Sequence, residues 1–187
     1  MKERLLIVLT VLVIFSSIFG EGIASEGKGD STIVSEIRFG LLSHDVGVFA
    51  QSFENGVDIN FDIFFKSPDK SFFRKFSSPR PMMGTCIHSD GQTSQVYGGL
   101  AWDFRTTDNI LLTFGLGGAV HSGELDSDDP GEQRLGSRVL FRLAMNVGYY
   151  FSERWNASFY WNHISNASLA TPNYGLDSMG LQIGYVF

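Results

Sequence analysis

The chain has 187 residues, one cysteine and a formal net charge of −6 at pH 7. The length suits a single domain, and one cysteine excludes an intramolecular disulfide framework. The acidic balance argues against a nucleic-acid-binding protein. A content of 17 Phe and 21 Gly beside only five Pro is typical of short strands joined by tight turns.

The N-terminus has the layout of a secretory signal peptide. Charged residues 2–4 precede an apolar run over residues 5–19, and small residues follow at Gly20, Gly22, Ala24 and Ser25. The run is short for a membrane-spanning helix. We therefore expect a signal peptide over residues 1–25, cleaved between residues 20 and 25, and a β-barrel domain over residues 26–187. A retained N-terminal anchor is the alternative.

Alternation of apolar and polar residues dominates the rest of the chain. In residues 57–66 the odd positions up to 65 are apolar, whereas Asp58, Asn60 and Asp62 occupy the other face. Residues 138–151 repeat this pattern over a longer stretch. A period of two residues indicates β-strands.

The alternation divides the chain into about eight strands, each long enough to cross a bilayer at the tilt of a barrel strand. No later stretch could form a transmembrane helix, so a membrane location requires a closed barrel. Pro79 and Pro81 make the start of the third strand the weakest prediction. The sequence predicts an all-β fold, an eight-stranded antiparallel transmembrane outer-membrane β-barrel, with strands over 33–43, 56–66, 80–89, 94–105, 109–120, 137–151, 154–165 and 175–187.

The connections and aromatic residues suggest an orientation. From a periplasmic N-terminus, the outer loops are 44–55, 90–93, 121–136 and 166–174, and the inner connections are 67–79, 106–108 and 152–153. Aromatic residues gather near the inner strand ends, and the chain closes on Tyr185-Val186-Phe187. A soluble lipocalin-like barrel would alternate too, with its apolar row inward. The membrane barrel is favoured by a bulky aromatic apolar row and by a polar row of both signs, as in a salt-bridged lumen: Glu36, Arg38, Asp58, Asp62, Asp103, Arg105, Arg138 and Arg142.

The last two strands carry residues that a passive barrel does not need. His163 and Ser165 continue the lipid-facing row of the seventh strand, and Asp177 continues that of the eighth. If the hairpin pairs symmetrically about its loop, His163 faces Asp177 and Ser165 faces Gly175. Ser165 would then be the nucleophile, His163 the base and Asp177 the group that orients it. The alternative is a polar pair at the membrane interface.

Two asparagines flank this group. Asn166 and Asn173 could supply amide donors to a developing oxyanion, or they could serve only as turn residues. Gly175 could leave space for an acyl chain or be a turn residue.

At these positions the sequence resembles the lipid A 3-O-deacylases of the PagL type, also called acyloxyacyl hydrolases. The resemblance lies in His163-Ile164-Ser165-Asn166-Ala167 and in Pro172-Asn173-Tyr174-Gly175-Leu176-Asp177, with weaker similarity around residues 41–46, 56–60, 97–102 and 136–141. It implies a barrel whose outer face cleaves the 3-O acyl ester of lipid A. It also implies His163 and Ser165 as catalytic residues, Asn166 and Asn173 at the oxyanion hole, and Asp177 at a position where the family typically has Glu.

The remaining polar residues give no cofactor or metal motif. Residues 126–129 form an acidic cluster that either binds divalent cations or is simply solvated. His44, His88 and His121 show no metal-ligand spacing. Cys86 is interpreted as a packing residue.

We therefore expect an exported outer-membrane serine esterase that acts on lipid A or lipopolysaccharide without a cofactor or metal, among outer-membrane lipids. Two alternatives stay open: an esterase that acts on phospholipids, and a non-catalytic structural or adhesive barrel.

Overall fold

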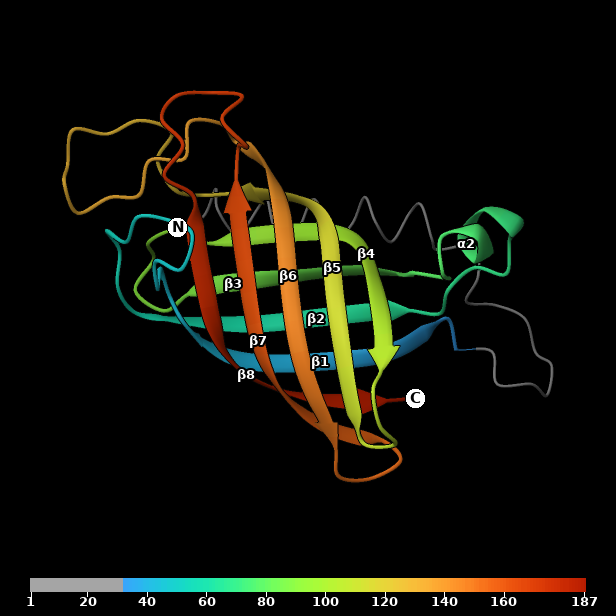
Figure 1. The fold of residues 1–187 in the computed structure, drawn as a ribbon. Coiled ribbons are helices and arrows are strands. Elements are labelled where there is room, and N and C mark those ends of the chain that lie inside the picture. Colours follow the sequence, from blue (N-terminus) through green and yellow to red (C-terminus); the bar gives the residue numbers. More distant parts are fainter. Residues whose placement is uncertain (1–31) are drawn as a thin grey trace. The chain divides into compact units, whose positions relative to one another are not determined.

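The computed structural model describes residues 32–187, so the expected signal peptide lies outside the described residues. Each strand pairs antiparallel with the next, and β8 pairs with β1, which closes the barrel (Figure 1). The strands are β1 (Val34–Ser43), β2 (Val57–Phe65), β3 (Arg80–His88), β4 (Gln95–Arg105), β5 (Ile110–His121), β6 (Val139–Tyr150), β7 (Trp155–Ser165) and β8 (Leu176–Val186).

The predicted strands are confirmed, each to within two residues at either end. The third strand forms despite its prolines, because Pro79 precedes it and Pro81 lies one residue from its start. One element was not predicted. The connection between β2 and β3 contains a five-residue helix, α2 (Ser71–Lys75).

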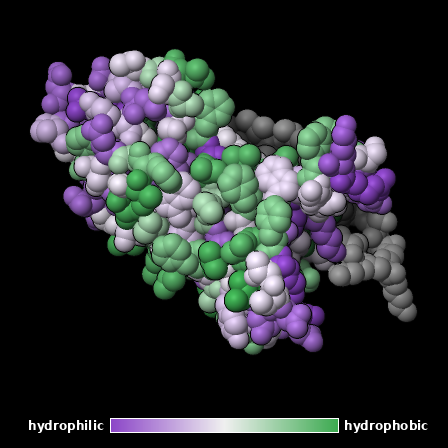
Figure 2. Space-filling model, in the orientation of Figure 1, coloured by the Kyte–Doolittle hydropathy of each residue, from purple (hydrophilic) through white to green (hydrophobic). Residues whose placement is uncertain are grey.

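The apolar row faces outward and the polar row faces inward. On β2 the outward Val57, Ile59 and Phe61 are exposed, whereas Asp58 and Asp62 are almost completely buried. Figure 2 shows hydrophobic side chains over the barrel wall and hydrophilic side chains gathered towards its ends. A soluble barrel would hide its apolar row, so the lipocalin-like alternative is wrong. Within residues 32–187, no helix is long and apolar enough to cross a membrane.

Polar side chains fill the lumen. The guanidinium of Arg142 lies 3.9 Å from the centre of the Tyr97 ring and donates to the Tyr160 hydroxyl. Gln182 donates to both Asn60 and Asp62, at 2.6 and 2.7 Å. Cys86 is buried in this core, as its interpretation as a packing residue requires. Because buried polar groups with partners are held firmly, the lumen provides a rigid support for the outer wall.

Four connections lie at one end of the barrel, here called the loop end: residues 44–56, 89–94, 122–138 and 166–175. Residues 66–79, 106–109 and 151–154 connect strands at the opposite end, here called the turn end. His163, Ser165 and Asp177 all lie at the loop end.

Candidate active site

The β7–β8 hairpin pairs in the register that the sequence predicts. His163 is directly opposite Asp177, and Ile164 is opposite Leu176. His163 Nδ1 and Asp177 Oδ1 are 2.9 Å apart. The carboxylate of an aspartate therefore reaches the imidazole directly, and it accepts a hydrogen bond from Nδ1 when that nitrogen carries the proton.

The 44–56 loop folds against the outer wall beside this hairpin. The backbone N–H groups of Phe49 and Ala50 donate to Asp177 Oδ2, at 2.6 and 2.8 Å. The N–H of Val46 donates to the backbone carbonyl of Asp177 at 2.9 Å. Both carboxylate oxygens of Asp177 are thus occupied, one by the imidazole of His163 and the other by two backbone amides.

This loop corrects one expectation from the sequence. Asp177 does continue the outward row of β8, but it is completely buried rather than exposed to lipid. The strand pattern could not predict that the 44–56 loop covers Asp177, because the contacts use main-chain amides of a loop that lies far away in the sequence.

Aromatic rings fix the position of the imidazole. The His163 ring stacks on Trp161, with centroids 6.0 Å apart and planes inclined by 15°. Phe49 of the covering loop meets the same imidazole edge-on, with centroids 6.2 Å apart. Packing on two sides leaves the ring few alternative rotamers, and its side chain is only 18% exposed.

Ser165 ends β7 two residues beyond His163, and it is half-buried. It pairs with Phe141 of β6, whose side chain is exposed on the outer wall. Among the described residues, no hydrogen bond reaches the Ser165 hydroxyl. The serine and the imidazole share one strand face, but the predicted pairing of Ser165 with Gly175 falls just beyond the end of the β7–β8 ladder.

The two asparagines have different surroundings. Asn166 is buried, and its amide group donates to the carbonyls of Leu135 and Pro172 at 3.0 and 2.9 Å. Its backbone N–H donates to Asn173 Oδ1 at 2.9 Å. Asn166 therefore connects the 166–175 loop to the 122–138 loop, with its donors already used. Asn173 uses one amide hydrogen on the Ser168 hydroxyl at 3.3 Å, which leaves the other without a partner among the described residues.

The chain turns sharply just after Asn166. Ala167 and Ser168 both have left-handed backbone conformations, with φ of 52° and 62°. This backbone conformation is uncommon for residues other than glycine. Where it occurs, it is found at functional sites more often than elsewhere. Ala167 and Ser168 follow Ser165 by two and three residues, and the sequence pattern did not reveal this turn.

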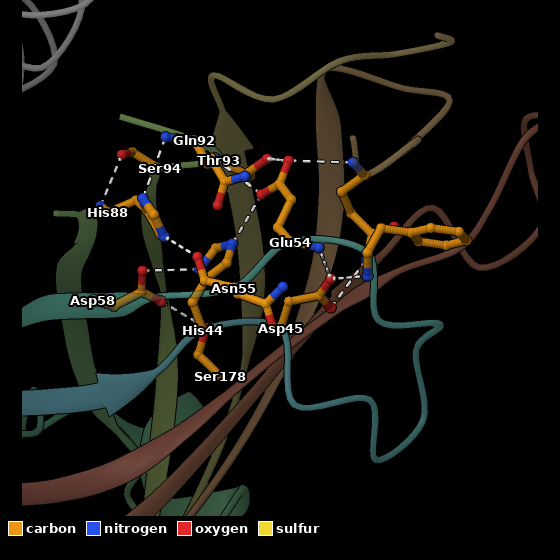
Figure 3. Close-up of polar contacts among 12 residues, drawn as sticks. His44, Asp45, Glu54, Asn55, Asp58, His88, Gln92, Thr93, Ser94 and Ser178 are labelled. Atoms are coloured by element: carbon orange, nitrogen blue, oxygen red, sulfur yellow. Dashed lines mark hydrogen bonds and ion pairs between the residues drawn. The ribbon is translucent and has the colours of Figure 1, made fainter. Parts of the chain in front are cut away.

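A buried polar cluster anchors the covering loop (Figure 3). His44 contacts Asp58 through Nδ1 at 2.8 Å and Glu54 through Nε2 at 2.9 Å. Asp58 also accepts from the hydroxyl of Ser178, the neighbour of Asp177 on β8, at 2.7 Å. Asp45 caps the backbone N–H groups of Phe53 and Glu54 at 2.6 and 2.9 Å. The cluster thus fixes both ends of the 44–56 loop.

The structure brings together two histidines that the sequence left apart. His44, Asp58 and His88 have ligand atoms within 4.8 Å of one another, because β1, β2 and β3 are neighbours. However, both ring nitrogens of His44 contact carboxylates, and both of His88 contact backbone groups. These contacts engage all four ring nitrogens of the two histidines and stabilise the loop.

The acidic cluster of residues 126–129 is partly engaged in its own loop. Ser127 donates to Glu132 at 2.6 Å, and Asp129 accepts the N–H of Gly131 at 2.8 Å. Both contacts lie within the 122–138 loop.

The pKa of His44 makes the cluster sensitive to pH. Burial lowers this pKa, but the hydrogen bonds to Asp58 and Glu54 outweigh burial and raise it from 6.5 to about 9. The stabilisation is therefore complete below about pH 6.5 and is lost as the pH rises through 9. We expect the urea midpoint of the folded barrel to fall across this range.

The matched control is His44→Gln, which keeps a polar side chain but cannot titrate. Its urea midpoint should be lower at neutral pH and should change less between pH 6.5 and 9. Parallel pH profiles for the two proteins would contradict a charged His44.

Known proteins resemble this chain in sequence and in fold. Residues 87–186 match the family model described as lipid A 3-O-deacylase (PagL). Among solved structures, the crystal structure of the outer membrane enzyme PagL is 20% identical, with a TM-score of 0.59, covering 82% of this chain and 100% of its own. Neisserial surface protein A is 8% identical, with a TM-score of 0.53, covering 82% of this chain and 96% of its own. A de novo designed transmembrane β-barrel gives the same identity and coverages with a TM-score of 0.51.

At these low identities the structural likenesses show the fold, an outer-membrane type of β-barrel. No curated protein matches the chain at a significant level. The family match spans more than half of the chain and includes both strands of the hairpin described above. The chain therefore belongs to the PagL family of lipid A 3-O-deacylases.

Proposed function

We propose that this protein removes the ester-linked 3-O acyl chain of lipid A through a Ser165–His163–Asp177 triad on the outer wall of the barrel. The observation that carries the proposal is the 2.9 Å contact between His163 Nδ1 and Asp177 Oδ1. Ser165 lies two residues beyond His163 on the same wall. The family match supports the reaction type and the lipid A substrate.

The surroundings of Ser165 suit a lipid substrate. Ser165 pairs with Phe141 and His163 pairs with Leu143, so apolar side chains of β6 flank the reacting group. A fatty acyl chain lying along this wall would stay in an apolar environment while its ester reaches the hydroxyl. A lumen site would offer none of this, because its lining is polar.

The proposed reaction proceeds in two steps. Ser165 Oγ attacks the ester carbonyl carbon while His163 Nε2 takes its proton, and Asp177 stabilises the resulting imidazolium. The lipid A alkoxide leaves with that proton, which gives an acyl-serine. Water activated by His163 then hydrolyses the acyl-serine, so that a free fatty acid departs and Ser165 regains its proton.

The developing oxyanion needs donors in this scheme. Asn173 offers its remaining amide hydrogen, and Asn166 contributes by holding the turn at Ala167 and Ser168. We expect Asn173→Ala to lower kcat roughly a hundredfold with little change in KM. The matched variant Ser168→Ala removes the partner hydroxyl of Asn173 but keeps the donor, and should stay near wild type. Unchanged turnover in Asn173→Ala would exclude this donor.

We further propose that the chain is exported by a signal peptide over residues 1–25 and lies in the outer membrane with its loop end outward. Lipid A occupies the outer leaflet, so this orientation brings the substrate to the hairpin. Protease cleavage of the 122–138 loop in intact cells, with the turn end protected, would be the expected pattern. The reverse pattern would contradict the orientation.

The function is tested by incubating the refolded barrel in detergent with purified lipid A and recording mass spectra. Loss of one hydroxyacyl chain from lipid A is the expected result. An unchanged spectrum from a folded barrel would contradict the proposal. Release of fatty acid from phospholipids in a parallel reaction would then identify the other esterase, and no reaction with either lipid would favour a structural barrel.

A further inference from the structure

The connection between β2 and β3 concentrates positive charge at the turn end of an acidic protein. Residues 32–187 contain three lysines, and all three lie in this connection, as Lys66, Lys70 and Lys75. Arg74 adds a fourth cation, whereas Asp69, its ion-pair partner, is the single carboxylate between residues 66 and 76. All four cationic side chains belong to exposed residues.

The same segment exposes aromatic side chains. Phe72 is 63% exposed and Phe76 is 50% exposed, and no residue of α2 is buried. The ring of Phe72 contacts those of Phe73 and Phe76, with centroids 5.8 and 4.9 Å apart. Such a cluster would be costly in water, since Phe72 and Phe76 each leave a large apolar surface exposed.

A hydrogen bond holds this segment against the outer wall of the barrel. Trp102 Nε1 donates to the backbone carbonyl of Phe76 at 2.8 Å. Trp102 lies on the outward row of β4, three residues before the strand ends at Arg105, and its ring contacts Phe114 of β5. The segment therefore meets the outside of the wall at the edge of its apolar surface, rather than plugging the lumen. Figure 2 shows hydrophilic side chains around α2, next to the hydrophobic wall.

We propose that segment 66–76 is an interfacial anchor that binds the anionic phospholipid headgroups of the leaflet at the turn end. Lys66, Lys70 and Lys75 contact the phosphate groups, while Phe72 and Phe76 enter the boundary of the acyl region. Charge complementarity selects an anionic surface, and continuity with the apolar wall selects a membrane surface. The inference rests on the barrel spanning a membrane, and it is independent of the catalytic residues.

The test places a fluorescent probe beside the phenylalanines. Ser71→Cys is labelled with an environment-sensitive dye in the whole barrel, with Cys86 replaced by alanine, and is reconstituted into phosphatidylcholine bilayers with or without phosphatidylglycerol. Quenching by acrylamide reports exposure to water, and a neutral quencher is required because an ion would itself respond to surface charge. We expect quenching to fall several-fold when phosphatidylglycerol is present, and to recover in high salt.

Two controls make the result specific. In the double variant Lys70→Gln and Lys75→Gln, quenching should no longer depend on phosphatidylglycerol. The mobility of the unheated variant on gels checks that its barrel is still folded. A probe at Glu153→Cys, in the exposed 151–154 turn at the same end, should be quenched equally in both bilayers.

Equal quenching of the Ser71 probe in both bilayers would overturn the proposal, as would an equal change at the Glu153 probe. Deacylation of lipid A in detergent should be unaffected by the lysine substitutions. Failure of the anchor is therefore distinguishable from failure of the proposed activity.

Discussion

Replacing Ser165 by alanine should lower the rate of lipid A deacylation by at least about three orders of magnitude, because the proposed nucleophile is removed. The barrel should remain folded, since the Ser165 hydroxyl makes no hydrogen bond among the described residues. The measurement is the initial rate of acyl-chain loss by mass spectrometry, with folding followed by gel mobility before and after heating.

Ser158→Ala is the matched control for this substitution. Ser158 lies on the same strand, but it is buried and accepts a hydrogen bond from Asn146 in the lumen. Its removal should affect stability more than turnover. A Ser165→Ala barrel that retains full activity would eliminate the triad as the mechanism.

Asp177→Asn should lower kcat by roughly two to four orders of magnitude. The amide retains the size of the carboxylate, but it places an NH2 group opposite either the His163 ring or the N–H groups of Phe49 and Ala50. An NH2 group that faces Nδ1 of His163 makes this nitrogen an acceptor, so the ring carries its proton on Nε2 and cannot take the proton of Ser165. An NH2 group that faces Phe49 and Ala50 opposes their N–H groups, which are also donors. The measurement is kcat for lipid A, with KM expected to change little.

Asp177→Glu tests whether the site requires the shorter acid at a position where the resemblance in sequence implies a glutamate. The additional methylene must fit a completely buried position whose second oxygen is already held by two amides of the 44–56 loop. We therefore expect the longer acid to be less active than aspartate, by tenfold or so, since overpacking displaces the ring or the loop. Wild-type turnover in this variant would show that the loop does not select the length of the acid.

The strands and the β7–β8 register could be predicted because side-chain alternation encodes them. A shift of one residue would place His163 and Asp177 on opposite faces, so the pattern leaves little freedom. The cover over Asp177 could not be predicted, because the amides of Phe49 and Ala50 carry no side-chain signature. The His44 cluster was missed for a related reason. Its members are 10 and 14 residues apart, and only the pairing of neighbouring strands and a folded loop brings them together.

Asn166 illustrates a different limit. Its position beside Ser165 suggested an oxyanion donor, but the carbonyls of Leu135 and Pro172 take up its amide group. Spacing along a chain indicates which residues can meet, but it does not indicate which competing acceptors a folded loop will supply. The competing acceptors come from two loops, Leu135 from residues 122–138 and Pro172 from residues 166–175, and neither loop has a regular pattern.

The hydrogen bonds that hold Asp177 connect the last strand of the barrel to the loop that follows the first strand. Asp177 belongs to the end of the chain, whereas the amides that hold it follow β1, and the two meet only when β8 pairs with β1. A chain in which β8 has not paired with β1 has the β7–β8 hairpin, but its Asp177 lacks the hydrogen bonds from Phe49 and Ala50. The proposed triad is thus complete only in the closed barrel, and we expect a chain that has stalled before closure to lack lipid A deacylase activity.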